Sequence, residues 1–322
     1  MKKNTILIGA GFSSAVLSRL LSSKNLSIFD KGRGPGGRSS TRKVESIGFF
    51  DHGLQFISPE EKKFELFLEH HSMSFAKEWR GEFLIFEKNK RISKKKYIGN
   101  SGNNDFVKKL ISVDVFYQKE LIQIKKLGSK WFLEFKDGSN QDCEQLILTI
   151  PLEQCKKIIA PLNLDFKIIG CMEPNLTAMI AFDKSLGIAA NGYRFEKNSI
   201  LGWAANESSK MRSENNPDLE LWTLQSSLLF ARKKFQNYSN NKEEVINLMV
   251  SEFFNLFNIK NVNIVHKDIH GWLYAFKNEN FTQKFYWNKE INLGICGDWM
   301  CGSRAEDAWS SASALADHIN NS

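Results

Sequence analysis

Three features are missing from this sequence of 322 residues: a long apolar run, a paired cysteine motif and an internal repeat. No apolar stretch approaches the ~20 residues of a transmembrane span, which argues against a membrane-spanning helix. The five cysteines form no CxxC pair and their number is odd, which is typical of reduced, intracellular proteins. The length and a hydrophobic content of 42% indicate a globular chain with one large or two smaller cores. We expect a cytoplasmic protein with no membrane partner.

The N-terminal stretch, residues 6–23, has two alternative interpretations, a secretory signal or the first turn of a nucleotide-binding domain. A signal peptide needs an unbroken apolar segment, but glycines and an arginine interrupt this one. Residues 5–8 have the pattern of a short buried strand, residues 16–21 place their apolar side chains on one helix face, and residues 26–30 form a second strand. The order strand, glycine turn, helix, strand favours the nucleotide-binding domain.

The chemistry of this turn follows from its residue types. Gly9 and Gly11 let a pyrophosphate approach the backbone N–H groups at the helix N-terminus, where the helix dipole favours negative charge. Asp30 lies 19 residues after Gly11 and is placed to accept hydrogen bonds from the ribose hydroxyls of an adenosine. Ser14 takes the place of the third glycine of the fingerprint and is expected to hold the helix slightly further from the strand. The alternative is a structural glycine turn.

A second glycine-rich loop follows directly after Asp30. Residues 30–42 combine a Pro-Gly-Gly turn, which permits positive φ angles, with three arginines, Arg33, Arg38 and Arg42. A domain that binds NAD alone does not need this loop, whereas a longer cofactor that continues beyond its pyrophosphate does. The alternative is a flexible basic turn.

The C-terminus carries a second candidate anion site. Residues 291–296 read as a buried strand, Gly297 and Asp298 as a turn, and Ser303 with Glu306 as a capping box that starts a helix. A helix N-terminus just after a strand end favours an anion, although an ordinary strand-to-helix joint has the same pattern. The helix presents a small, close-packing face, formed by Ala305, Ala308, Ala312, Leu315 and Ala316.

Two further patterns receive structural interpretations. The net charge is +8, and its densest segment, residues 88–96, reads as a solvated hairpin or as a docking face for a phosphate-rich partner; we expect no nucleic-acid partner. His266 and His270 have the spacing of two metal ligands on a helix, but the alternation around them indicates a strand. We therefore expect no metal site.

Four segments together resemble one known family. Residues 29–42 and 50–56 at one end, and 294–299 and 302–312 at the other, are similar to the flavin motifs of the renalase-like branch of the flavin-containing amine oxidase superfamily. The resemblance spans the chain but is loose from about residue 60 to 265, where three shorter patches match, residues 203–210, 222–227 and 272–275.

This resemblance implies an α/β fold with a discontinuous Rossmann-like FAD-binding domain and an α+β substrate domain built on a mixed or antiparallel sheet. We assign residues 1–60, 101–155 and 285–322 to the FAD-binding domain and residues 61–100 and 156–284 to the substrate domain. The FAD is expected to be noncovalent, because the cysteine that links flavin in amine oxidases lies further upstream than Cys301. The oligomeric state is left open, with a monomer favoured.

The resemblance also implies the cofactor contacts. The C-terminal helix end would face the pyrimidine edge of the isoalloxazine ring, and Asp298 would bind the ribityl or pyrophosphate portion. The expected cofactor-binding residues are Gly9, Gly11, Phe12, Ser13, Ser14, Asp30, Lys31, Gly36, Gly37, Arg38, His52, Gly53, Gln55, Gly297, Asp298, Arg304 and Ala305.

The implied activity is that of an oxidase that takes a hydride onto flavin N5 and passes two electrons to O2, giving H2O2. The expected substrate is a small molecule, a 2- or 6-dihydro isomer of NAD(P)H, which becomes aromatic on losing hydride and needs no strong base. The catalytic candidates are His52, Gln55, Trp272 and Tyr274, although core aromatics would look the same in sequence. The alternatives are an amine oxidase, a flavin-dependent desaturase or other non-oxidase flavoprotein, and a plain nicotinamide dehydrogenase.

Overall fold

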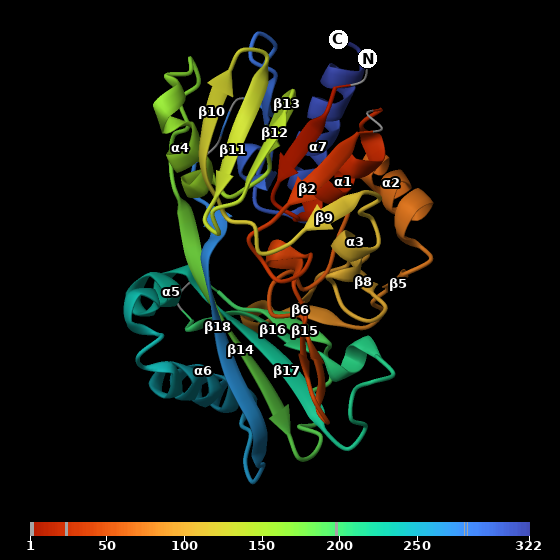
Figure 1. Ribbon diagram of the computed structural model, residues 1–322. Coiled ribbons are helices and arrows are strands. Elements are labelled where there is room, and N and C mark those ends of the chain that lie inside the picture. Colours follow the sequence, from red (N-terminus) through yellow and green to blue (C-terminus); the bar gives the residue numbers. More distant parts are fainter. Residues whose placement is uncertain (1–2, 23–24, 197–198, 280, 282) are drawn as a thin grey trace.

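Two large sheets organise the molecule. The computed structural model describes residues 3–22, 25–196, 199–279, 281 and 283–322. A six-stranded sheet lies near both chain ends, and a seven-stranded sheet lies at the opposite end of the molecule (Figure 1). The α/β fold class expected from the sequence is therefore confirmed.

The six-stranded sheet has the order β19-β20-β13-β1-β2-β9 and is parallel except for the edge strand β19. Its inner strands β1, β13 and β20 are mostly apolar and buried along their whole length, as expected of strands covered on both faces. The glycine turn joins β1 to helix α1, as predicted. The bounds are β1 Thr5–Ile8, β2 Leu26–Phe29, β9 Asp114–Phe116, β13 Gln145–Leu148, β19 Tyr286–Asn288, β20 Leu293–Ile295 and α1 Phe12–Leu20.

Helix α7 (Ala305–Asn320) packs beside α1 on this sheet. The predicted small face is confirmed, since Ala308, Ala312, Leu315 and Ala316 are all buried in the core that contains Leu7 and Val16 of β1 and α1. Helix α2 (Lys62–Ser72) joins the same core through Phe64, Phe67 and Leu68. It therefore packs on the dinucleotide side, although residues 61–100 are assigned above to the substrate domain.

The seven-stranded sheet has the order β18-β14-β17-β16-β15-β6-β7. Its neighbours are antiparallel except β15 and β6, so the sheet is mixed. Helix α6 covers one face with apolar side chains, and the other face is turned toward the dinucleotide half (Figure 1). The bounds are β6 Phe83–Ile85, β7 Lys90–Arg91, β14 Met172–Phe182, β15 Gly192–Arg194, β16 Leu201–Asn206, β17 Glu220–Ser226, β18 Ile264–Lys277 and α6 Lys242–Phe257.

Smaller elements connect the two sheets. A three-stranded antiparallel sheet stands beside α4 and shares a core with β13 and β20. Two short strand pairs are also present, β3 with β4, which packs through Phe50 on Met179 and Leu221 of the seven-stranded sheet, and β5 with β8. The bounds are β3 Arg42–Val44, β4 Gly48–Phe50, β5 Ala76–Glu78, β8 Tyr97–Gly99, β10 Leu121–Leu127, β11 Lys130–Phe135, β12 Asn140–Cys143, α3 Asp105–Lys108, α4 Leu152–Ile159 and α5 Leu228–Lys234.

The basic segment 88–96 contains β7, which pairs with β6 as a hairpin. Its cations largely meet acids: Lys88 pairs with Glu196, Arg91 with Glu82, Lys94 with Glu60 and Lys95 with Glu65. The solvated hairpin is therefore the better interpretation of this segment. Lys96 is buried at 2% exposure, and its Nζ lies 4.0 Å from the ring centroid of Phe83.

His266 and His270 lie on β18, so the predicted strand around them is confirmed. Among the described residues, no group of three or more His, Cys, Asp or Glu side chains is arranged to hold a metal ion. In the same part of the chain, no helix combines the length and the apolar character that crossing a membrane would require.

Candidate cofactor and substrate site

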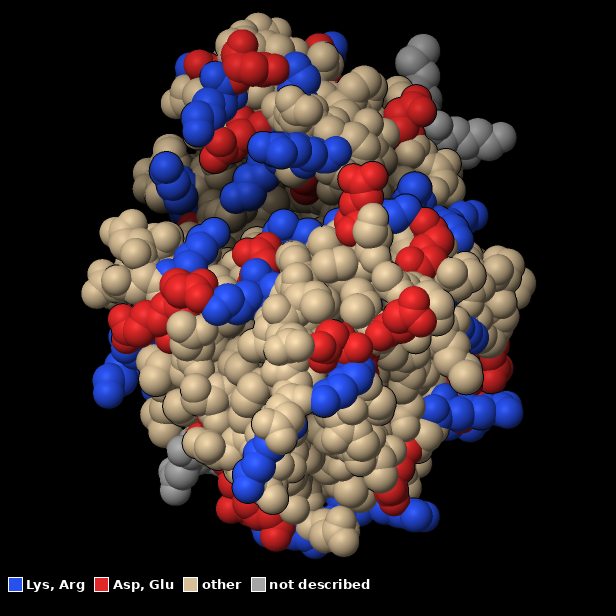
Figure 2. Space-filling view, turned by 90° about the horizontal axis from the view of Figure 1, so that it is seen from below, with Lys and Arg blue, Asp and Glu red and all other residues tan. Residues whose placement is uncertain are grey.

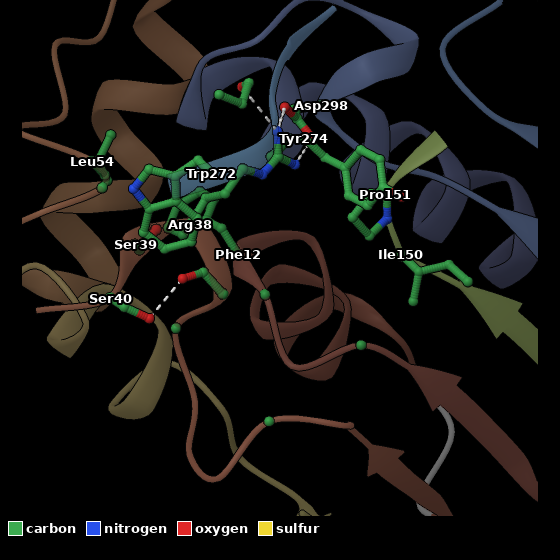
Figure 3. A pocket seen from close by; sticks show the side chains of 18 of the residues that line it. Phe12, Arg38, Ser39, Ser40, Leu54, Ile150, Pro151, Trp272, Tyr274 and Asp298 are labelled. Atoms are coloured by element: carbon green, nitrogen blue, oxygen red, sulfur yellow. Dashed lines mark hydrogen bonds and ion pairs between the residues drawn. The ribbon is translucent and has the colours of Figure 1, made fainter. Parts of the chain in front are cut away.

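A cavity of about 1180 Å³ is lined by residues of both large sheets. Sites for one small ligand usually have roughly 300–1,000 Å³, so this cavity has room for more than one molecule. Figure 3 shows Phe12, Arg38, Trp272 and Tyr274 around it. We call the residues from the six-stranded sheet and its loops the cofactor wall, and those from the seven-stranded sheet the substrate wall.

The glycine turn of the cofactor wall stands at the N-terminus of α1. Gly9 has φ +105°, and a Cβ there would lie 2.9 Å from Thr149 Oγ1, so glycine is required. Gly11 is the N-cap of α1 and lines the cavity, and a Cβ added to it would meet no protein atom within 4 Å. The space beside Gly11 is thus open to a ligand at the positive end of the helix dipole.

Asp30 holds the two glycine loops together. One carboxylate oxygen accepts a hydrogen bond from Ala10 N at 2.7 Å, and the other accepts from Gly32 N at 2.6 Å. Asp30 also lines the cavity, where a ribose hydroxyl could reach it. The predicted ribose contact stays a prediction, while the structural role of Asp30 is additional.

Ser14 lies behind the turn and not against the cavity. Its Oγ donates a hydrogen bond to Gly9 O at 2.5 Å and lies 2.8 Å from Thr149 Oγ1. The hydroxyl thereby fixes the turn from its protein side. This position differs from the direct cofactor contact that we expected for Ser14.

Arg38 and Asp298 join the two ends of the sequence. The guanidinium and carboxylate form a two-pronged ion pair at 2.5 and 2.7 Å, visible in Figure 3. Both Asp298 oxygens are therefore engaged by Arg38, and a ligand would meet the pair and not a free carboxylate. Gly297 lies behind this pair, off the cavity, with its N–H donated to Ser311 Oγ at 3.0 Å.

Helix α7 begins at the cavity, but its cap differs from the predicted Ser303–Glu306 box, which is wrong. Arg304 is the N-cap, and Asp307 accepts hydrogen bonds from Ser303 N at 3.0 Å and Arg304 N at 2.9 Å. Glu306 instead accepts from the backbone N–H groups of residues 60 and 61 at the start of α2. The tertiary contact with α2 takes Glu306 away from the capping position.

Gly53 is the point where the two walls touch. A Cβ on Gly53 would lie 2.0 Å from Arg38 O and 3.1 Å from the Trp272 ring. The Gly53 carbonyl accepts a hydrogen bond from Gln225 Nε2 of β17 at 2.8 Å, and Leu54 N donates to Arg38 O at 2.8 Å. Only glycine permits this approach.

His52 supports Trp272 from behind. The His52 ring is 5% exposed and stacks on Trp272 at a centroid distance of 5.3 Å, and Trp272 Nε1 donates to His52 O at 2.7 Å. Burial, followed by the nearby His270, lowers the pKa of His52 to about 4. His52 is therefore neutral at pH 7 and does not line the cavity. This placement favours a supporting role for His52 over acid–base chemistry.

The other catalytic candidates do line the cavity. Trp272 and Tyr274 both face it from β18 (Figure 3). Gln55 donates its side-chain N–H to Asp51 O, and its Oε1 is buried with no hydrogen-bond partner among the described residues. The expected cofactor residues that line the cavity are Gly9, Gly11, Phe12, Ser13, Asp30, Lys31, Gly36, Gly37, Arg38, Gly53, Gln55, Asp298, Arg304 and Ala305.

Sequence reasoning missed a buried ion cluster directly beside this site. Asp51 accepts from Lys210 Nζ at 2.7 Å and from Arg212 at 2.6 Å, and Glu207 also pairs with both cations. All four side chains are at most 1% exposed. Burial by itself would raise the pKa of Asp51, but Arg212 and Lys210 hold that pKa well below its ordinary value.

The Asp51 cluster ties three segments together. The second Asp51 oxygen accepts from Thr41 Oγ1 at 2.6 Å and Asn103 N at 3.0 Å. Thr41 follows the Gly-Gly-Arg loop, whereas Lys210 and Arg212 follow β16 of the substrate wall. No spacing in the sequence connects residue 51 with residues 207–212, so only the fold brings them together.

Most residues of the substrate wall were also not predicted from the sequence. It includes Asn175, Arg194, Trp203 and Gln225, each from a different strand. On the cofactor wall, Ile150 and Pro151 line the cavity just after β13. Their position at the carboxyl end of a parallel strand is the signal that could have identified them, because ligands of such sheets bind there.

Comparisons with known proteins agree with this architecture. Residues 7–70 match the family model described as an NAD(P)-binding Rossmann-like domain. A structure assigned as a protoporphyrinogen oxidase from Exiguobacterium sp. 255-15 is similar with a TM-score of 0.76 and 10% identity, covering 100% of this chain and 99% of that one. A reduced UDP-galactopyranose mutase gives 0.72 and 12% identity, with 100% and 94% covered. A putrescine oxidase variant gives 0.68 and 10%, with 99% of each chain covered. At such identities the likeness shows the fold alone.

Proposed function

We propose that this protein is an FAD-dependent oxidoreductase that binds its flavin noncovalently along the cofactor wall. One observation carries the proposal: the glycine turn, the Gly-Gly-Arg loop with Arg38, and the start of α7 come from distant parts of the sequence and line one cavity. The similarity in fold to proteins described as protoporphyrinogen oxidase and putrescine oxidase supports it. The proposed division into an FAD-binding and a substrate domain rests on the same arrangement.

The residues present fit a flavin dinucleotide. Gly11 and the start of α1 leave open space for a pyrophosphate at the positive end of the helix dipole. Cys301 does not line the cavity, and burial, followed by Asp307, raises the pKa of its thiol to about 11. A thiol that stays protonated is a weak nucleophile, which supports noncovalent binding.

The proposed substrate is a 2- or 6-dihydro isomer of NAD(P)H. When bound, the flavin supplies the hydride acceptor and the route for two electrons to O2. The chain then has to orient a flat ring and exclude water, and Trp272 and Tyr274 present aromatic surface for that purpose. His52 is buried and neutral, so the chain offers no strong base at this point, and a substrate that becomes aromatic on losing hydride needs none.

An amine is the second candidate substrate. The similarity in fold to a putrescine oxidase and the pair Trp272 and Tyr274 favour it. Against it, four cations that line the cavity have no carboxylate partner within ion-pair distance among the described residues, namely Lys31, Arg33, Lys157 and Arg194. They would repel an ammonium group and attract a phosphate-bearing molecule.

All five cysteines are free, and we place the protein in the cytoplasm.

The test is anaerobic mixing of the flavin-loaded protein with each dihydronicotinamide isomer and, separately, with a panel of amines, while the flavin absorbance is followed. Rapid bleaching by a dihydro isomer, reversed by O2 with formation of H2O2, is the expected result. Bleaching by amines alone would replace the proposed substrate, and bleaching that O2 does not reverse would indicate a non-oxidase flavoprotein.

A further inference from the structure

The substrate wall carries a row of side chains that runs across five strands. Strand pairing places Arg194 opposite Trp203, Trp203 opposite Gln225, Gln225 opposite Thr177, and Thr177 opposite His270. Residues directly opposite each other in antiparallel strands point to the same face of a sheet. Three neighbouring members of the row, Arg194, Trp203 and Gln225, line the cavity, whereas Thr177 and His270 do not.

Arg194 is the charged member at the far end of this row. Among the described residues of the seven-stranded sheet that line the cavity, it has the only charged side chain; the others are Asn175, Gly202, Trp203, Gln225 and residues 272–276. The structure shows no carboxylate within ion-pair distance of Arg194 in the described part of the chain. The guanidinium is exposed and free to bind an anion.

The spacing along the row sets the size of the ligand. Gln225 touches Gly53, where the two walls meet, and Arg194 lies two strands further along the sheet. With neighbouring strands 4.7–4.9 Å apart, Arg194 is about 10 Å from that junction. Trp203 covers the interval with an aromatic surface. A ribose and its phosphate can bridge such an interval.

We propose that Arg194 is a specificity residue that binds the phosphate group of the substrate while the reacting ring lies near Gly53 and Trp272. This inference rests on the proposed function and deepens it by naming the residue that binds the phosphate of the substrate. Figure 2 shows Lys and Arg side chains gathered around a hollow in one face of the molecule, which agrees with an anionic ligand. A cationic amine would be disfavoured at the same position.

The test compares two forms of one substrate, 6-dihydronicotinamide adenine dinucleotide and the phosphate-free 6-dihydronicotinamide riboside. Anaerobic stopped-flow reduction of the flavin gives a dissociation constant and a limiting rate for each. R194A is expected to raise the dissociation constant of the dinucleotide by roughly tenfold to hundredfold and to leave that of the riboside unchanged. R194K keeps the charge but not the planar guanidinium, so its dissociation constant for the dinucleotide should lie between those of the unaltered protein and R194A.

Arg91 provides the matched control. It lies on β7 of the same sheet, pairs with Glu82 at 2.8 Å and does not line the cavity, so R91A should bind both compounds as the unaltered protein does. Equal weakening of both compounds by R194A, or no weakening, would overturn the assignment of Arg194.

The failure of the proposed function would look different, because neither compound would then reduce the flavin of the unaltered protein. In that event the Arg194 site is tested by calorimetric titration of the oxidised, flavin-loaded protein with NAD+. R194A must weaken this binding while R91A does not. The Arg194 site would be refuted if the unaltered protein did not bind NAD+, or if R194A bound NAD+ as tightly as the unaltered protein does.

Discussion

The two walls of the cavity are built in opposite ways. The cofactor wall consists of short continuous segments in which glycines such as Gly11 leave room for a ligand. The substrate wall consists of single side chains, Arg194, Trp203 and Gln225, that meet only because their strands are neighbours. The difference teaches that a glycine turn open to a ligand is encoded locally in the sequence, whereas a surface built of single side chains depends on strand register.

Two contacts hold the walls in register. The Asp51 cluster links Thr41 of the cofactor loop to Lys210 and Arg212 of the substrate side. The Gly53 junction links Arg38 to Gln225. Substitutions within one wall should therefore change the binding of one ligand. Substitutions in these contacts should also change the stability of the folded protein.

The largest expected effect is that of D51A. Removing one partner leaves buried cations uncompensated, so the free energy of unfolding should fall by about 3–5 kcal/mol. The measurement is urea denaturation. D142N, at an exposed carboxylate paired with Lys130, serves as the control and should unfold like the unaltered protein.

D51A should also weaken FAD binding more than E207A does, because Asp51 alone bonds to Thr41 and Asn103. Equal FAD affinities in the two variants would show that the cluster has no link to the cofactor wall.

The second prediction concerns the pH dependence of stability. The pKa of His52 is about 4 in the folded protein and ordinarily 6.5, so between these pH values the unfolded chain binds a proton that the folded protein does not. Stability therefore falls on acidification, by roughly 3 kcal/mol between pH 7 and pH 4 from this group. H52N should remove that contribution and flatten the profile, as measured by denaturant unfolding at several pH values. Parallel profiles for both proteins would refute the buried, neutral His52.

The third prediction compares a substitution at the Gly53 junction between the walls with a substitution at Gly11 in the cofactor wall. G53A places a methyl group against Arg38 O, so it should destabilise the protein by about 1–3 kcal/mol and weaken both ligands. G11A meets no protein atom, so it should lower the stability of the flavin-free protein by no more than about 1 kcal/mol, the cost of alanine at an N-cap, and weaken FAD alone. Thermal unfolding and FAD titration of both variants test this contrast. A G11A variant that binds FAD as tightly as the unaltered protein would mean that the space beside Gly11 is not reserved for a ligand.

The smallest effect is expected for C301S. Cys301 lies off the cavity with its thiol protonated, so the substitution should not change the flavin content or the flavin spectrum. Denaturation of either protein should release free FAD into the filtrate. Flavin that stays with the precipitated unaltered protein but not with C301S would contradict noncovalent binding.

The sequence predicted the cofactor wall far better than the substrate wall. Gly9, Gly11 and Asp30 are recognisable because their spacing reflects a contiguous strand, turn and helix. Within that region, the Ser303–Glu306 cap failed because Glu306 is recruited by α2, a tertiary contact that local pattern does not encode. Trp272 and Tyr274 were identified through the resemblance, since their spacing alone did not distinguish a pocket from a core.

The remaining site residues are brought together by pairing between strands and could not be predicted from the sequence. Arg194 and Gln225 meet in one row only through the register of β15, β16 and β17, and Asp51 meets Lys210 across 159 residues of sequence. A shift of one residue in any of these strands would turn the side chains to the other face. Neither composition nor spacing specifies such a register.

The central claim is that the cofactor wall holds FAD, and the absorbance spectrum of the purified protein tests it most directly. We predict flavin bands in the folded protein and, after heat denaturation and filtration, one equivalent of free FAD per chain in the filtrate. A colourless protein that also fails to bind added FAD, while a nicotinamide dinucleotide occupies the glycine turn, would contradict the account.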